Sequence, residues 1–134
     1  MHNLDFTFNY GASHYQLHEL TSKCQDENPP GMIEGFKNQA AKCISEAKQK
    51  DTGTLQYDRF IDSDNTECEI RETYENSDAL LAHVEHLREP LRILFEQFAT
   101  DHSIVIYGDP SPQLLENAKS RRINVKTYSF LQGL

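Results

Sequence analysis

The chain has 134 residues, with 13 Lys and Arg against 21 Asp and Glu, so its formal charge at pH 7 is −8. This length suits a single domain. The mean hydropathy is −0.68, and no apolar run approaches the ~18 residues that a membrane span requires. An acidic chain without a stripe of basic residues repels the phosphates of nucleic acids. The composition therefore excludes a transmembrane protein and argues against a nucleic-acid partner.

The three cysteines, Cys24, Cys43 and Cys68, are odd in number and include no Cys-x-x-Cys pair. This pattern favours reduced thiols and a cytoplasmic location over a disulfide framework or a thiolate metal site. No secretory signal is predicted at the N-terminus. Residues 1–12 are expected to form an extension, in which Phe6, Phe8 and Tyr10 alternate with polar residues as in a short strand.

A strand is predicted over residues 15–24, and a polar turn containing Pro29 and Pro30 separates it from a helix. Gly53 is expected to end this helix in the left-handed conformation. The helix is predicted because apolar residues recur at steps of three and four, which places them on one face. These residues are Ile33, Phe36, Ala40, Ile44 and Ala47.

A β-hairpin is predicted next, with strands over residues 54–62 and 66–74 joined by the turn Ser63-Asp64-Asn65. Alternation along the first strand predicts one shared face, which comprises Leu55, Tyr57, Arg59 and Ile61. A second helix is expected to begin at Asn76 or Ser77, and Pro90 is expected to divide it in two.

The remaining residues predict a short apolar strand over 103–107, a helix from Ser111 to Ala118 and a last strand over 125–130. Residues 108–134 thus form a C-terminal extension of one domain, residues 1–134. The core order of strand, helix, strand, strand, helix, strand is that of a ferredoxin-like α+β fold, with helices on one face of an antiparallel sheet. Phe60 on the opposite face of the hairpin predicts that a second copy covers the sheet.

Three segments together resemble the antibiotic biosynthesis monooxygenase (ABM) family over about residues 15–107. They are Gly53-Thr54-Leu55-Gln56-Tyr57, Glu72-Thr73-Tyr74-Glu75-Asn76-Ser77 and Ala79-Leu80-Leu81-Ala82-His83. The resemblance implies a ferredoxin-like dimeric α/β barrel with a pocket between sheet and helices. Family members include cofactor-free oxygenases of phenols or quinols, haem-degrading oxygenases and a sugar-phosphate isomerase. The oxygenases often carry Trp at or near the position of Tyr74, and this chain has no Trp.

His83 and Glu72 are the candidate catalytic residues. His83 lies three residues after Leu80 and four before Leu87, so it borders the apolar stripe of its helix and can point toward the sheet. A neutral imidazole there could remove a proton from a phenol or enol. Glu72 would serve as a base or orient His83, or it would pair with Arg59 on the neighbouring strand.

Tyr57, Arg59 and Tyr74 are the candidate substrate-binding residues, and the two tyrosines have a core role as the alternative. His83 and His86 have a spacing that suits a metal, but no third ligand is evident, so no metal site is predicted. Cys68 is expected to be a small buried side chain.

The residues and the resemblance together predict a homodimeric monooxygenase that acts on a small phenolic or quinol substrate without a cofactor. Two other functions stay open. One is a dimeric protein that binds a small aromatic or other apolar ligand without turnover, and the other is an isomerase of a small hydroxyketone, for which Arg59 would supply the basic group beside the pocket.

Overall fold

The computed structural model describes residues 15–24 and 32–134. The expected extension over residues 1–12, with Phe6, Phe8 and Tyr10, lies outside these ranges, as does the turn over 25–31. The elements are β1 (Tyr15–Cys24), α1 (Met32–Lys50), β2 (Thr54–Ile61), β3 (Cys68–Tyr74), α2 (Ser77–His86), α3 (Arg88–Ile93), the π-helical turn η2 (Leu94–Phe98), β4 (Ala99–Tyr107), α4 (Pro112–Ser120) and β5 (Asn124–Tyr128). None of the helices in the described ranges is long and apolar enough to cross a membrane.

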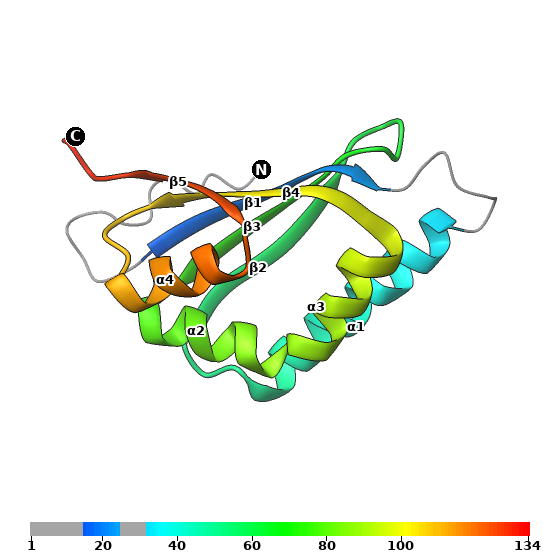
Figure 1. Cartoon of the computed structure of the whole chain (residues 1–134), viewed down its shortest axis with the longest axis horizontal. Coiled ribbons are helices and arrows are strands. Elements are labelled where there is room, and N and C mark those ends of the chain that lie inside the picture. The colour runs from blue at the N-terminus through cyan, green and yellow to red at the C-terminus, as the bar shows by residue number, and fades with distance from the viewer. Residues whose placement is uncertain (1–14, 25–31) are drawn as a thin grey trace.

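The five strands form one sheet in the order β2-β3-β1-β4-β5. The pairs among β1 to β4 are antiparallel, and β5 adds to the edge in parallel with β4. Figure 1 shows the four α-helices on the same side of this sheet. The predicted ferredoxin-like α+β fold is therefore confirmed, and the residues after β4 add one helix and one strand to it.

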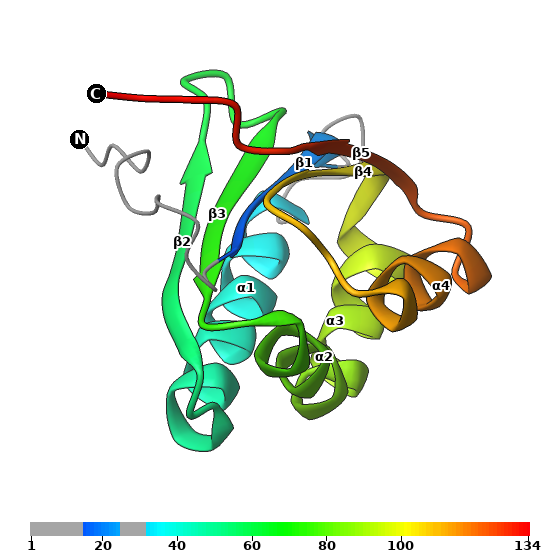
Figure 2. The same cartoon turned by 90° about the vertical axis from the view of Figure 1, so that its left-hand side faces the viewer.

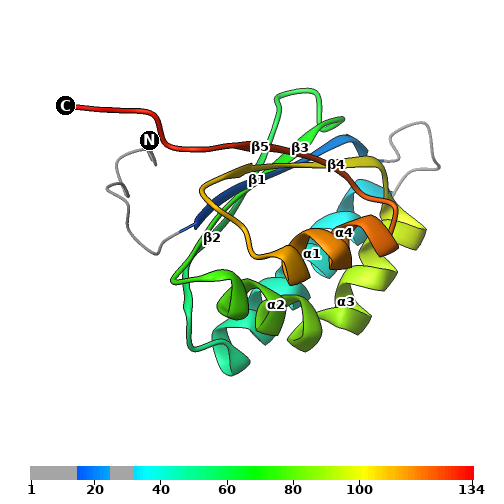
Figure 3. The same cartoon turned by 60° about the vertical axis from the view of Figure 1, so that its left-hand side comes forward.

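The helices are spread across the width of the sheet. In the turned views, α1 lies beneath β2 and β3, α2 and α3 lie near the middle, and α4 lies beneath β4 and β5 (Figures 2 and 3). Two buried clusters fill the space between these layers. One joins α1, β3 and the helices after α2, and the other joins β3 and β4 to α2 and α4.

Helix α1 packs on the sheet through the stripe that its sequence predicts, with one exception. Phe36, Ala40 and Ala47 are buried, but Ile44 is 38% exposed and Cys43 is fully buried instead. Cys43 contacts the core cluster that contains Cys68 of β3. Including Ile44 in the buried stripe was wrong, because the helix presents the neighbouring residue to the sheet.

Phe36→Ala and Leu94→Ala should each destabilise the protein by about 3 kcal/mol, because both side chains are buried in the same core cluster and truncation leaves a cavity. Ile44→Ala is the matched control on the surface of α1, and it should cost less than about 1 kcal/mol. Urea unfolding measures all three. A midpoint for Phe36→Ala equal to that of Ile44→Ala would contradict this account of the core.

The hairpin of β2 and β3 is shorter than predicted and begins with an irregularity. Thr54 pairs with Tyr74 while Gln56 pairs with Thr73, so Leu55 has no partner of its own across the ladder. Leu55 is 52% exposed as a result. The predicted face that Leu55 shares with Tyr57 is therefore interrupted, because this bulge changes the alternation at the start of the strand.

The second helical region begins and divides as predicted. The side chain of Asn76 accepts a hydrogen bond from the Ala79 backbone N–H and caps α2. The division falls at Leu87, three residues before Pro90. The Pro90 carbonyl accepts a 2.9 Å hydrogen bond from the buried Gln39 of α1, which joins the two helices.

The face of β2 and β3 away from the helices is largely polar. Thr73 donates to Gln56 over 3.0 Å, and Gln56 donates to Asp58 over 2.9 Å. Phe60 is 42% exposed on the same strand. Apolar residues were expected on both faces of the hairpin. On the face away from the helices, this expectation holds only at Phe60.

Candidate functional site

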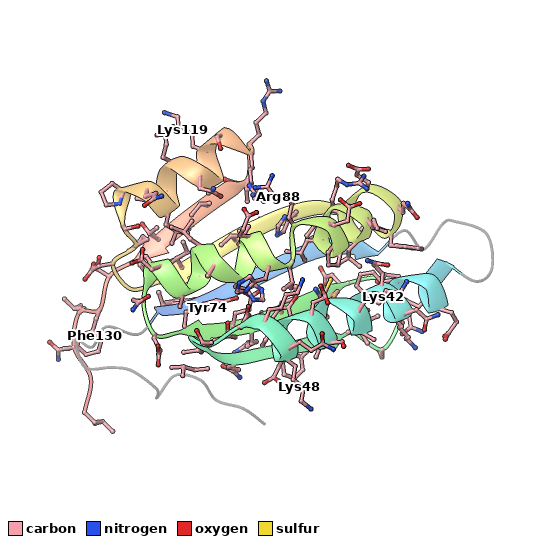
Figure 4. All side chains as sticks on the ribbon, turned by 90° about the horizontal axis from the view of Figure 1, so that it is seen from below. Lys42, Lys48, Tyr74, Arg88, Lys119 and Phe130 are labelled. Carbon is pink, nitrogen blue, oxygen red and sulfur yellow. The ribbon has the colours of Figure 1, made fainter. Side chains whose placement is uncertain are left out.

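The imidazole of His83 lies in the interior, between α2 and the hairpin. It is 3% exposed, and its ring centre lies 4.7 Å from that of Tyr57 and 5.3 Å from that of Tyr74, edge-on to both. Figure 4 shows the molecule from the helix side, with Tyr74 beneath the helices. The prediction that His83 points toward the sheet is confirmed.

Asp51, which the sequence did not single out, holds His83 in place. One of its carboxylate oxygens lies 2.6 Å from Nδ1 of His83, and the other lies 2.7 Å from Nδ1 of His86. Thr54 donates a third hydrogen bond over 2.7 Å. The Asp51 side chain is only 4% exposed, so these three contacts replace the water that the carboxylate loses on folding.

The contacts of Asp51 fix the proton on His83. Burial raises the pKa of Asp51, but the hydrogen bonds from His86, His83 and Thr54 outweigh this effect and hold the pKa below its ordinary value. Asp51 is therefore ionised at neutral pH and accepts from both imidazoles. The Nδ1 atom of His83 must therefore carry a hydrogen and donate it to Asp51, which turns Nε2 away from that carboxylate.

Glu72 and Tyr74 lie on the Nε2 side of His83. Nε2 is 3.9 Å from Oε1 of Glu72, and the hydroxyl of Tyr74 donates a short hydrogen bond to the same oxygen. Glu72 is 5% exposed and Tyr74 is fully buried. His83 thus lies between two buried carboxylates, an arrangement that stabilises the ring when it gains a proton.

Arg59 is joined to the cluster through Tyr57. Its guanidinium donates to the Tyr57 hydroxyl over 3.0 Å. The sheet register pairs Glu72 with Tyr57 and Arg59 with Ile70. The structure therefore brings all five predicted site residues to one region, with Glu72 and Tyr74 on one side of His83 and Tyr57 and Arg59 on another.

A separate cavity of about 710 Å³ lies between α2, α3 and α4, beneath β4 and β5. This volume is within the range of small-molecule sites, roughly 300–1,000 Å³. Its wall is mainly apolar and includes Leu80, Val84, Phe95, Ile104, Ile106 and Leu114. The Ser111 backbone N–H donates to the buried Ser77 hydroxyl over 2.9 Å, which attaches the start of α4 to the start of α2. The C-terminal extension therefore closes one side of the cavity.

The cavity lies between the sheet and the helices, as the resemblance implies, but away from the predicted site residues. Its described lining includes none of the five predicted site residues. Leu80 and Val84 of α2 face the cavity, whereas His83 between them faces the hairpin. Tyr74 packs against His83 and also belongs to the core cluster of Leu80 and Ile106, so its ring lies between the imidazole and the cavity wall.

Comparison with solved structures shows the same architecture in several proteins. MupZ from Pseudomonas fluorescens superposes with a TM-score of 0.69 at 18% identity, over 90% of this chain and 93% of MupZ. An antibiotic biosynthesis monooxygenase gives a TM-score of 0.57 at 17% identity, over 73% and 99% of the two chains. The chain has the antibiotic biosynthesis monooxygenase fold.

A protein from Nitrosomonas europaea, provisionally classed as such a monooxygenase, shares this ABM fold with a TM-score of 0.61 at 20% identity. That match covers 78% of this chain and 98% of the other. No family model and no curated protein matches the sequence.

Gly53 allows the ABM fold to bring Asp51 close to α2. A Cβ atom at this position would lie 2.6 Å from Cβ of Ala79, and the Gly53 carbonyl accepts a 3.0 Å hydrogen bond from the Glu75 backbone. Among the glycines that the structure describes, Gly108 has a positive φ and Gly53 does not. The expectation of a left-handed Gly53 was therefore wrong, and close packing against α2 explains the glycine instead.

Gly53→Ala should destabilise the protein by about 1–3 kcal/mol, because the added methyl group pushes α2 away from the start of β2. Gly133→Ala is the control, since its added Cβ would meet only ordinary contacts at 3.7 Å. Thermal unfolding of both variants tests this. Equal melting temperatures would show that α2 can shift at no cost.

The structure also locates Cys68 and the histidine pair of α2. Cys68 is 2% exposed within the main core cluster, as its sequence context indicates. His83 and His86 both turn their Nδ1 atoms toward Asp51. Across the described residues, no three His, Cys, Asp or Glu side chains are grouped so that they could hold a metal ion.

Proposed function

We propose that the protein is a cofactor-independent monooxygenase of a small phenolic or quinol substrate, with His83 as its base. The observation that carries the proposal is the buried pair of Asp51 and His83, whose 2.6 Å contact through Nδ1 orients the imidazole so that Nε2 points away from Asp51. General bases of this kind contribute typically about 10²- to 10⁴-fold to a rate.

His83 would take the hydroxyl proton of the substrate at Nε2, and the ionised Asp51 would stabilise the resulting imidazolium. The substrate anion then reduces dioxygen. A ring C–H carbon becomes a carbonyl, one oxygen atom enters the product, and the other leaves as water with that ring hydrogen and the hydroxyl proton that His83 removed. The substrate supplies every electron, so the balance needs no further reductant.

Glu72, Tyr74, Tyr57 and Arg59 are proposed to hold the base and the substrate. The hydrogen bond from Tyr74 to Glu72 extends the polar cluster from Nε2 toward the cavity wall. Arg59 fixes the hydroxyl of Tyr57, whose ring meets the edge of His83. We propose that the substrate binds in the cavity on the neighbouring face of α2. Movement of the Tyr74 ring would then bring the substrate into contact with Nε2 of His83.

A second candidate function is binding of an apolar ligand without turnover. One observation favours it, namely that the described lining of the cavity lacks the His83 cluster. The isomerase alternative loses its main support, because the basic residue on which it relied, Arg59, contacts Tyr57 rather than lining this cavity.

Oxygen uptake with a panel of naphthoquinols, without added metal, flavin or haem, separates the two functions. The monooxygenase proposal expects uptake above the spontaneous rate and one water formed per oxygen molecule consumed. Binding of the same quinols under anaerobic conditions, measured by calorimetry, provides the second readout. Binding without any enzyme-dependent uptake would favour the non-catalytic function.

We also propose that the chain forms a homodimer through the face of the sheet away from the helices, as in a dimeric α/β barrel. Phe60, Tyr107 and Tyr128 are each about 40% exposed, and the last two stack with ring centres 5.3 Å apart. Exposed apolar residues also follow β5, among them Phe130 and Leu131. Light scattering should give twice the chain mass of 15.4 kDa, and a monomer at micromolar concentration would contradict this.

A further inference from the structure

We infer that the cavity between α2, α3 and α4 binds an apolar molecule that ends in a single carboxylate, which Arg121 and Arg88 hold at the opening. This inference names a substrate class for the proposed function. It rests on that function in one respect, namely that the cavity is the substrate site. It is argued from the shape and charge of the cavity, independently of His83.

The cavity has an apolar interior and a polar opening. The buried and half-buried lining residues are mostly aliphatic or aromatic, such as Leu80, Ile106 and Leu114. The exposed lining residues are charged and comprise Arg88, Arg92, Arg121 and Glu96. A ligand that fills this space therefore places its body among apolar side chains and its end group among three guanidinium groups and one carboxylate.

The three arginines are not equally available to a ligand. Arg92 lies between Glu89 and Glu96 and bonds to both. Arg88 bonds to Glu85 alone over 2.6 Å. Arg121 forms no ion pair with another described residue, although it ends α4 at the opening. Among the three arginines at the opening, Arg121 is thus the one that a ligand can reach without breaking an ion pair to a described residue.

Arg88 and Arg121 reach the opening from different helices, since Arg88 begins α3 and Arg121 ends α4. Figure 4 shows Arg88 in the space between α2 and α4. The pKa of Glu85 is lowered by its hydrogen bond with Arg88, by the charge of Arg88 and to a smaller extent by the charge of Arg121. Both guanidinium groups line the same cavity, so a ligand carboxylate at its opening can meet them together. Guanidinium binds carboxylate through paired hydrogen bonds, which an alcohol cannot match.

Calorimetry with decanoate, decan-1-ol and acetate tests the inference on the full chain under anaerobic conditions. Decanoate should bind about tenfold or more tightly than decan-1-ol, and acetate should show no saturable binding because it lacks the apolar body. Ala118→Phe, which adds volume to the lining of the cavity, should weaken both ten-carbon ligands. Circular dichroism of that variant checks that it folds.

Arg121→Gln is the decisive variant, and it should remove the preference for decanoate while leaving the affinity for decan-1-ol unchanged. Lys119→Gln is the matched control, because it removes the same charge from the same helix on the side away from Arg88 (Figure 4). Equal binding of acid and alcohol to the wild type would overturn the inference. An equal loss in both variants would also overturn it, since the effect would then reflect overall charge.

This experiment and the oxygen assay can fail separately. A carboxylate preference without oxygen uptake would support the inference about the cavity and contradict the monooxygenase proposal. Oxygen uptake from neutral quinols, with no preference for decanoate over decan-1-ol, would support the monooxygenase and overturn the inference.

Discussion

His83→Asn should lower oxygen-dependent quinol turnover by about 10²- to 10⁴-fold, because the amide cannot accept a proton at neutral pH. Asn also preserves a hydrogen-bond donor beside Asp51. His83 is buried between two carboxylates. Removing the imidazole entirely would leave both without a shared partner, so the amide is the better substitution.

His86→Asn is the matched control for this experiment. His86 is also a histidine of α2 that bonds to Asp51, over 2.7 Å, but a third of its side chain is exposed. We expect turnover to change by less than about tenfold, because His86 only helps to position Asp51. Equal losses in the two variants would show that the carboxylate network matters and that His83 has no distinct role as a base.

Asp51→Asn should destabilise the protein by about 3 kcal/mol, because one neutral amide replaces a buried carboxylate that accepts three hydrogen bonds. The amide nitrogen would face one of the two imidazole N–H groups and leave that donor unsatisfied. Urea unfolding at pH 7 measures the loss. Asp64→Asn, at an exposed turn position, changes the charge equally and should cost less than about 0.5 kcal/mol.

The cost of Asp51→Asn should also depend on pH. The folded-state pKa of Asp51 lies below its ordinary value of 3.8, so the unfolded chain binds the proton first as the pH falls. The stability that ionised Asp51 contributes is therefore complete well above pH 3.8 and is lost as the pH falls through the folded pKa. The difference between wild type and Asp51→Asn should shrink on acidification in this window. A difference that stays constant down to pH 2 would contradict the ion-paired role.

The sequence predicts the elements of this fold well because their periodicity is strong. The apolar stripe of α1, the Asn76 cap and the division of the helix before Pro90 are all local features, and each is found in the structure. The bulge at Leu55 and the exposure of Ile44 were missed. Both depend on how an element meets its neighbour, which the period of one segment does not specify.

The site is less predictable because its main contacts are long-range. Asp51 lies 32 residues before His83 in the sequence, within a polar segment that is typical of a helix end and a turn. The sequence indicates Gly53 as a helix end, but its close contact with Ala79 depends on the crossing of β2 and α2. The lining of the cavity was not predicted either, because the cavity forms only when α4 and β5 lie against α2 and β4.

The central claim is that His83 removes the substrate proton, and anaerobic spectroscopy of a bound naphthoquinol tests it most directly. Without oxygen, the wild type should bind the quinol and produce the absorption band of its anion at neutral pH. His83→Asn should bind the same quinol with similar affinity and produce no such band. An anion band of equal strength in His83→Asn, or none in the wild type at saturation, would contradict the claim.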